Sequence, residues 1–305
     1  ISPTLLKPGA WTAKMPLDEY DTTAEDLTSK LAPSPPPKSR PIEDIVKSVG
    51  QPQAQDLLAA QQMIQGLPDV LRTELRRVEH AREILLALLF EPGGGSDKQH
   101  TLVRAGLGEA SLEKAQQFWH LIGDIGRQHR LSILQLTLPA FRALDSVSQR
   151  SFLVLAREVV FSDQKFDLFE YVALTIIESQ AESKKRRKID GKPTKQDIAL
   201  VMSAVAYAGN HELAQAKAAF DNGLAAFNET SQRGLEFCPP DRCKFEHLSP
   251  AVWRLAHALP ESKRGLIEGC MRIILADRNV SQEENELLHA VCAVLEAPLP
   301  VMAAG

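Results

Sequence analysis

Two stretches of equal length share one pattern and decide the fold of this chain. The first runs Arg150-Ser-Phe-Leu-Val-Leu-Ala-Arg-Glu-Val-Val-Phe-Ser-Asp-Gln-Lys-Phe-Asp-Leu-Phe-Glu170, and the second runs Arg264-Gly-Leu-Ile-Glu-Gly-Cys-Met-Arg-Ile-Ile-Leu-Ala-Asp-Arg-Asn-Val-Ser-Gln-Glu-Glu284. They align without a gap, and their apolar positions correspond although few residues are identical. Each reads as an apolar helix, an aspartate, a short turn, a capping residue and the start of a second helix. The sequence therefore predicts two helix-turn-helix units of the same design.

The rest of the chain extends this helical pattern. A similar short helix precedes each unit, Pro139-Ala-Phe-Arg-Ala-Leu144 in one case and Pro250-Ala-Val-Trp-Arg-Leu255 in the other. Apolar residues recur at threes and fours, as the buried face of a helix requires. The expected helices lie near 57–75, 78–91, 98–107, 111–129, 132–144, 147–162, 167–182, 194–208, 211–228, 249–258, 260–276 and 281–295. No run alternates with the period of two that is typical of a half-buried strand, so we expect an all-α fold.

Breaks in this pattern predict the domain organisation. Eight of the 19 prolines lie between Pro3 and Pro41, and proline blocks helix interiors. The predicted parts are an extended proline-rich linker over 1–40, a helical lobe with the first unit over 41–182, a basic loop over 183–193 and a helical lobe with the second unit over 194–302.

Composition excludes several classes of protein. The 305 residues are 44% hydrophobic and 24% charged, which is typical of a globular protein. A formal net charge of −4 argues against nucleic acid as a partner, because that binding needs a basic face. No segment has the roughly 20 apolar residues that span a bilayer. Four cysteines do not make a disulfide framework and favour a reducing, cytoplasm-like setting. The chain begins at Ile1 instead of methionine, which indicates a piece of a longer polypeptide.

The acidic residues of the two turns have two possible roles. The candidate metal ligands are Asp163, Asp167, Glu170, Asp277 and Glu284. Their carboxylates could hold a divalent cation, although the central glycine of an EF-hand loop is absent. Alternatively, the residue before each second helix is an N-cap, and the glutamate three residues later completes a capping box. The spacing fits a capping box in both copies, so we expect caps and keep the metal site as the alternative.

One basic run is a candidate interaction site. It consists of Lys184, Lys185, Arg186, Arg187 and Lys188. Such a run could contact phosphates or lipid head groups. A loop between two helices in an acidic protein is more often simply solvated, and that is the competing interpretation.

The sequence contains fragments of zinc motifs but no complete one. The segment His211-Glu-Leu-Ala-Gln215 differs from the zinc-peptidase helix His-Glu-x-x-His at the second metal ligand. Cys238, Cys243 and His247 have part of a zinc-site spacing without an obvious fourth ligand, so a plain loop is favoured over a zinc site or a disulfide. We therefore expect no catalytic residues and no cofactor in this chain.

Several short sequence segments, spread over most of 41–302, resemble a known protein family. They are 45–50, 81–90, 136–144, 152–163, 169–171, 286–292 and 298–300. These segments resemble the C-terminal region of the HtpX-like (M48) family of bacterial membrane-anchored zinc metallopeptidases. The acidic turns are also similar to those of TerB-like helical domains of tellurite resistance, where paired acidic positions have been linked to metal. The turns of that family usually contain Asp-Gly. This chain has Asp163-Gln164 and Asp277-Arg278 instead, so the glycine is replaced in both turns.

The resemblance implies a function for the chain. In the M48 family a protease domain precedes this region and supplies His-Glu-x-x-His, a further glutamate and transmembrane helices, none of which is present here. The chain would then be a soluble, non-catalytic accessory region for regulation, substrate recruitment or partner binding, and zinc would belong to the parent peptidase. Its implied partner is the membrane-embedded peptidase domain of the same polypeptide, with the cytoplasmic side favoured, besides a possible protein partner or substrate. The alternatives are a metal-responsive TerB-like binding domain and a free-standing helical scaffold.

Overall fold

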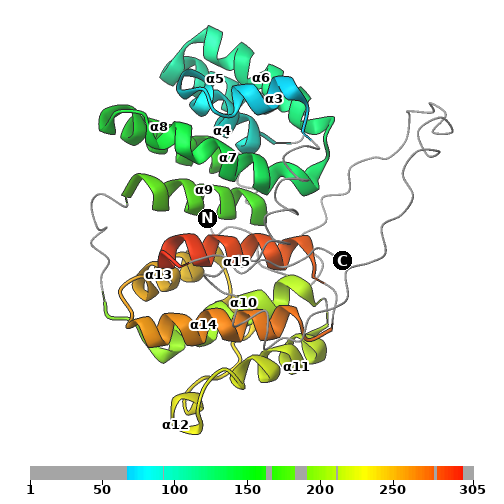
Figure 1. Cartoon of the computed structure of the whole chain (residues 1–305), viewed down its shortest axis with the longest axis vertical. Helices are drawn as coiled ribbons and strands as arrows, with labels where there is room; N and C mark the ends of the chain where they lie inside the picture. Colours follow the sequence, from blue (N-terminus) through cyan, green and yellow to red (C-terminus); the bar gives the residue numbers. More distant parts are fainter. Residues whose placement is uncertain are drawn as a thin grey trace, which may run out of the picture.

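Helices account for all the regular structure in the part of the chain that can be described. The computed structural model describes residues 67–91, 93–162, 167–182, 191–210, 212–277 and 280–297. These residues form α-helices and short 3-10 helices, and none of them forms a strand (Figure 1). The predicted all-α fold is therefore confirmed. The predicted linker over 1–40 lies outside the described residues.

The helices fall into two groups on either side of residues 183–190. The first group comprises α3 (Asp69–Glu74), α4 (Ala81–Leu89), α5 (Asp97–Leu107), α6 (Glu109–Gly123), α7 (Arg130–Arg142), α8 (Ser146–Val160) and α9 (Leu168–Glu182). The second group comprises α10 (Lys195–Gly209), α11 (Leu213–Leu224), α12 (Glu229–Gln232), α13 (Phe245–Leu255), α14 (Pro260–Ile274) and α15 (Gln282–Leu295). Three 3-10 helices lie between them, at Val78–His80, Arg127–His129 and Pro240–Arg242.

Several predicted helix boundaries are wrong. In the described part of the helix expected over 57–75, α3 begins only at Asp69, after Pro68, and the helix expected over 211–228 ends at Leu224. The helix expected over 111–129 ends at Gly123, because the chain turns at Gly126, whose φ of 98° is a left-handed conformation that glycine adopts without strain. The helix expected over 249–258 begins at Phe245 and carries Pro250 in its interior. Burial of Phe245 and Leu248 explains the earlier start, since both side chains gain from packing in the core.

The two repeated units pack against each other through equivalent helices. In the first unit α9 follows α8, and in the second α15 follows α14. Among the described helices, α9 and α15 form the most extensive contact, and they lie side by side in the centre of the stack (Figure 1). We call this contact the seam.

The duplication extends beyond the two units. In the first group α4 contacts α7, α8 and α9, and in the second group α10 contacts α13, α14 and α15. Likewise, α5 packs on α8 and α11 packs on α14. The two groups therefore share one arrangement of helices around a central helix, as expected of a repeated structural unit.

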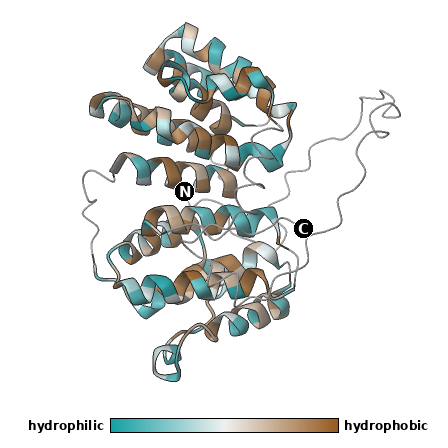
Figure 2. Ribbon diagram, in the orientation of Figure 1, coloured by the Kyte–Doolittle hydropathy of each residue, from teal (hydrophilic) through white to brown (hydrophobic). Residues whose placement is uncertain are grey.

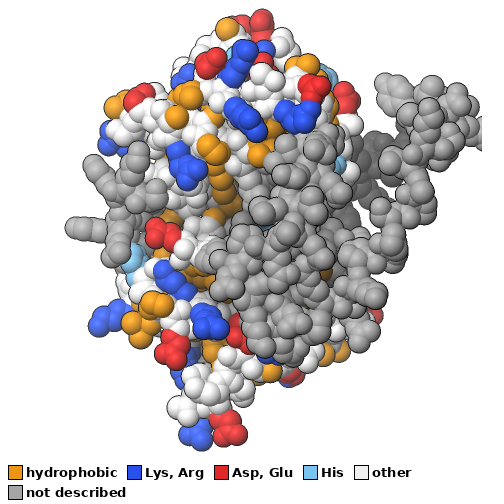
Figure 3. Space-filling view, in the orientation of Figure 1, with side chains coloured by type: hydrophobic (Ala, Val, Ile, Leu, Met, Phe, Trp, Pro, Cys, Tyr) orange, Lys and Arg blue, Asp and Glu red, His pale blue; other side chains and the backbone are white. Residues whose placement is uncertain are grey.

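The helices at the seam are buried around most of their circumference. Every residue of α9 from Leu168 to Ser179 is buried, and α9 is coloured mainly as hydrophobic in Figure 2. A helix that is apolar all round belongs in an interior, so α9 takes the centre of the stack. The buried apolar cluster is continuous from α4 to α15, while the division into two lobes stays a prediction. On the face shown in Figure 3, basic side chains are interspersed with acidic and hydrophobic ones.

Candidate functional site at the seam

The acidic turn of the first unit caps α9. The backbone N–H of Glu170 donates to Asp167 Oδ1 at 2.7 Å, and the backbone N–H of Asp167 donates to Glu170 Oε2 at 2.9 Å. These reciprocal hydrogen bonds satisfy two amide groups that the helix itself leaves unpaired. The predicted capping box is confirmed here. The remaining candidate ligand of this turn, Asp163, lies outside the described residues.

The second turn has the same arrangement at α15. The backbone N–H of Glu284 donates to Ser281 Oγ at 3.1 Å, and the backbone N–H of Ser281 donates to Glu284 Oε2 at 2.9 Å. Asp277 is exposed just after α14. Within the described ranges no three His, Cys, Asp or Glu side chains are grouped closely enough to hold a metal ion. The metal interpretation of the turns stays a prediction.

Glu284 is more deeply buried than a capping residue needs to be. Only 3% of the residue is exposed, and its carboxylate lies against the last residue of α10, where a methyl group on Gly209 would overlap it. Burial raises the pKa of Glu284 to about 7, while the hydrogen bonds from Ser281 act in the opposite direction. The absence of a side chain at Gly209 therefore lets the carboxylate enter the core.

This burial predicts a pH-dependent stability. Between about pH 4.5 and pH 7 folded Glu284 retains a proton that the unfolded chain releases, so the free energy of unfolding falls as the pH rises through that window. Glutamine also completes a capping box and carries no charge. We expect Glu284→Gln to raise the free energy of unfolding by about 2 kcal/mol at pH 8 and to leave it nearly unchanged at pH 4. Urea unfolding followed by circular dichroism at both pH values measures the difference.

Two controls separate the effect of Glu284 from other contributions to the pH dependence. Burial lowers the pKa of His289 to about 4, which gives an opposite slope, so only the difference between wild type and variant isolates Glu284. Glu284→Ala removes the capping box as well as the charge and should lower stability at pH 4. Destabilisation by Glu284→Gln at pH 8 would contradict the assignment.

A partly buried arginine contacts two neighbouring helices at one end of the seam. Arg130, the first residue of α7, donates from Nη2 to the carbonyl oxygen of Leu88 at 2.5 Å and lies 3.9 Å above the ring of Phe169. Burial lowers its pKa, and the negative charges of Asp167 and Glu286 oppose that shift. The charge of Arg130 is therefore felt both at the first acidic turn and on α15.

The carboxylate beside this arginine belongs to α15. Burial raises the pKa of Glu286 to about 7, against a hydrogen bond from Gln282 Nε2 at 2.7 Å and the attraction of Arg130. The position in α9 that aligns with Glu286 is Val172. The electrostatic attraction between Arg130 and Glu286 therefore has no equivalent at the aligned position of the other copy.

A cavity opens at the other end of the seam. It has a volume of about 430 Å³ and is lined by the second halves of α7, α9 and α15. Leu138, Ile176 and Cys292 contribute apolar surface from the three helices. Its volume lies within the range of small-ligand sites.

The polar groups of this cavity include a neutral histidine. Gln135 Nε2 lies 2.6 Å from His289 Nδ1. Because an amide nitrogen donates, Nδ1 accepts and the proton of the neutral ring is on Nε2. The lowered pKa of His289, caused by burial, keeps the ring uncharged at neutral pH. No residue in the described part of the chain is a hydrogen-bond partner of its Nε2.

Charged residues line the same cavity. Arg142 at the end of α7 is exposed, and no carboxylate among the residues described forms an ion pair with it. Glu296, which follows α15 with a left-handed φ of 54°, is also exposed. The cavity therefore combines an apolar surface, a neutral donor and an available guanidinium.

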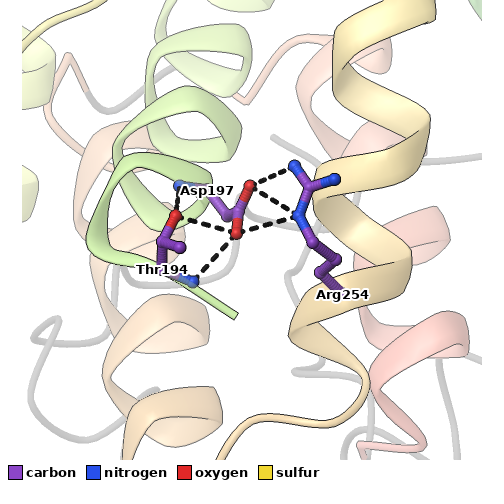
Figure 4. A network of polar contacts seen from close by, with 3 residues as sticks. All are labelled: Thr194, Asp197 and Arg254. Carbon is purple, nitrogen blue, oxygen red and sulfur yellow. Dashed lines mark hydrogen bonds and ion pairs between the residues drawn. The ribbon is translucent and has the colours of Figure 1, made fainter. Parts of the chain in front are cut away.

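A second polar network is structural. Thr194 and Asp197 form a capping box at the start of α10, and Arg254 of α13 donates to both oxygens of Asp197 (Figure 4). The Asp197 side chain is 5% exposed and that of Arg254 is 25% exposed. This buried pair ties α13 to α10, and it lies apart from the residues that line the cavity.

The remaining candidate residues of the sequence fall partly outside the described part of the chain. Lys184, Lys185, Arg186, Arg187 and Lys188 lie outside the described residues, and so does His211. Of the zinc-like fragment, Cys243 is buried, Cys238 is partly buried and His247 is exposed.

The residues that make the seam polar were not predicted from the sequence. Arg130, Gln135, Glu286 and His289 lie on α7 and α15, whose other inward positions are mostly apolar. Glu286 and His289 are three residues apart and therefore share one face of α15, which is the signal that could have indicated them. Their partners on α7 are far away in sequence, and no local pattern connects them.

Comparisons of the chain with family models, curated proteins and solved structures give no match. None of the described helices is long and apolar enough to cross a membrane.

Proposed function

We propose that this chain is a non-catalytic accessory region of an M48-like membrane zinc metallopeptidase, and that it recruits substrate to the peptidase. The segments that resemble the M48 family support the proposal that the chain belongs to such a peptidase. The duplicated helical body supports a binding role. In this proposal zinc and the catalytic glutamate belong to a peptidase domain on the same polypeptide, at the cytoplasmic side of the membrane.

The observation that supports a binding role is that the carboxylates singled out above have structural roles. Asp167, Glu170 and Glu284 cap helices, and Asp197 ties two helices together. Groups committed to caps and buried pairs stabilise a fold, whereas a general acid or base must reach a substrate proton. Such a body is suited to positioning a partner.

Two measurements test this proposal. Mass spectrometry of the intact native polypeptide should find a segment with His-Glu-x-x-His upstream of residue 1. A native terminus at residue 1 would contradict the parent enzyme and favour a free-standing scaffold.

The second measurement is a peptidase assay of the purified chain with casein and added zinc. We expect no turnover by the chain alone. Turnover that a chelator abolishes would overturn the non-catalytic role.

A further inference from the structure

We propose that the cavity at the seam binds the C-terminal end of an apolar polypeptide, with Arg142 pairing to the terminal carboxylate and with His289 and Gln135 hydrogen-bonding to the backbone. This inference deepens the proposed recruiting function by naming the substrate class. It rests on that function only for its biological role, because binding by the purified chain requires no attached peptidase.

Charge complementarity favours a carboxylate as the ligand group. Arg142 lines the cavity without an ion-pair partner among the described residues, and a guanidinium binds a carboxylate through two parallel hydrogen bonds. Glu296 lines the same cavity and would repel a doubly charged phosphate more strongly than a singly charged carboxylate. A single terminal carboxylate therefore matches this surface.

The neutral polar groups match a peptide backbone. His289 presents an Nε2–H donor, and Gln135 retains its carbonyl oxygen as an acceptor after its amide donates to Nδ1. A peptide unit offers the complementary pair, one carbonyl oxygen and one N–H. An uncharged histidine adds no preference for a second charge.

The apolar surface accounts for the side chains of the ligand. Leu138, Ile176 and Cys292 line the cavity from three different helices, and apolar side chains of the ligand would bury surface against them. This combination of an apolar surface with a few placed polar groups is typical of binding sites.

The internal duplication shows that the repeated fold does not require an exposed arginine at the position of Arg142. In the alignment of the short helices that precede the two units, Arg142 corresponds to Trp253. Trp253 is buried in the hydrophobic core, whereas Arg142 is exposed at the cavity. An arginine at this corner is therefore a property of one copy.

Fluorescence anisotropy with the full 305-residue chain tests the proposal. The probe is a pool of N-terminally labelled hexapeptides that end in two residues drawn from Leu, Val, Ile and Met, compared with the same pool carrying a C-terminal amide. We expect saturable binding of the free-acid pool and at least tenfold weaker binding of the amidated pool. Equal binding of the two pools, or no binding of either, would overturn the proposal.

Variants locate the binding. Arg142→Gln should weaken binding of the free-acid pool at least tenfold, whereas the matched control Arg150→Gln, on an exposed arginine of α8, should leave it unchanged. His289→Phe should weaken it several-fold while the thermal unfolding monitored by circular dichroism shows a folded chain. Unchanged binding by Arg142→Gln would refute the site.

A competition experiment distinguishes recognition of a peptide C-terminus from binding of any apolar carboxylic acid. Octanoate has a carboxylate and an apolar chain but no peptide groups, so we expect it to displace the peptides only weakly. Displacement by octanoate at the same concentration as by unlabelled peptide would exclude recognition of a polypeptide end. Neither result depends on the mass of the native polypeptide, so this inference and the parent enzyme can fail separately.

Discussion

Replacing Arg254 by methionine is expected to lower the free energy of unfolding by about 3 kcal/mol, because it leaves the carboxylate of Asp197 buried without its partner. Arg254 Nη2 lies 2.5 Å from Asp197 Oδ1, and the Asp197 side chain is only 5% exposed. We place the loss at the low end for a buried pair because the arginine is 25% exposed. Urea unfolding at pH 7 measures it.

The exposed pair between Arg104 and Glu109 is a matched control. Its side chains are 50% and 56% exposed, so Arg104→Met should leave stability essentially unchanged. In the double variant Arg254→Met with Asp197→Asn, the buried charge is absent and part of the loss should be recovered. Equal losses from Arg254→Met and Arg104→Met would show that the network in Figure 4 contributes little.

Replacing Gly223 by alanine is expected to lower the free energy of unfolding by about 2 kcal/mol, because α11 and α14 meet there without room for a methyl group. A Cβ at Gly223 would lie 2.8 Å from Ile273 Cγ1 and 2.9 Å from the carbonyl oxygen of Gly269. Since the second neighbour is backbone, a rotamer change cannot relieve the overlap and the helices must separate. The cost exceeds the gain of roughly 1 kcal/mol in helix propensity.

Gly123 is the control for this substitution. It ends α6, and a Cβ there would meet nothing within 4 Å. Gly123→Ala should therefore be neutral or slightly stabilising through helix propensity. A stabilising Gly223→Ala would indicate that α11 and α14 are not packed this closely.

Local signals in the sequence predicted much of the fold. The alignment of the two units indicated a duplicated helix-turn-helix, and α8–α9 and α14–α15 have that form. The spacing of Asp167 with Glu170, and of Ser281 with Glu284, indicated the two capping boxes. These features depend on residues within one helical turn of each other, where geometry is nearly independent of the rest of the molecule.

The errors arose where a local signal met a tertiary requirement. The helix expected over 249–258 has Pro250 in its first turn, where proline is tolerated. The structure begins α13 at Phe245 because Phe245 and Leu248 are buried, and that packing outweighs the hydrogen bond that Pro250 cannot make.

By itself the sequence determined that this chain is helical, that its helix-turn-helix unit occurs twice, and where the second helix of each unit is capped. Only the tertiary structure decided that α9 and α15 pack together, that Gln135 meets His289 across 154 positions, and that Gly209 admits the carboxylate of Glu284. The physical reason is range. Helix periodicity and capping act within a few residues, whereas the choice of which apolar faces meet depends on side-chain shapes from distant parts of the chain.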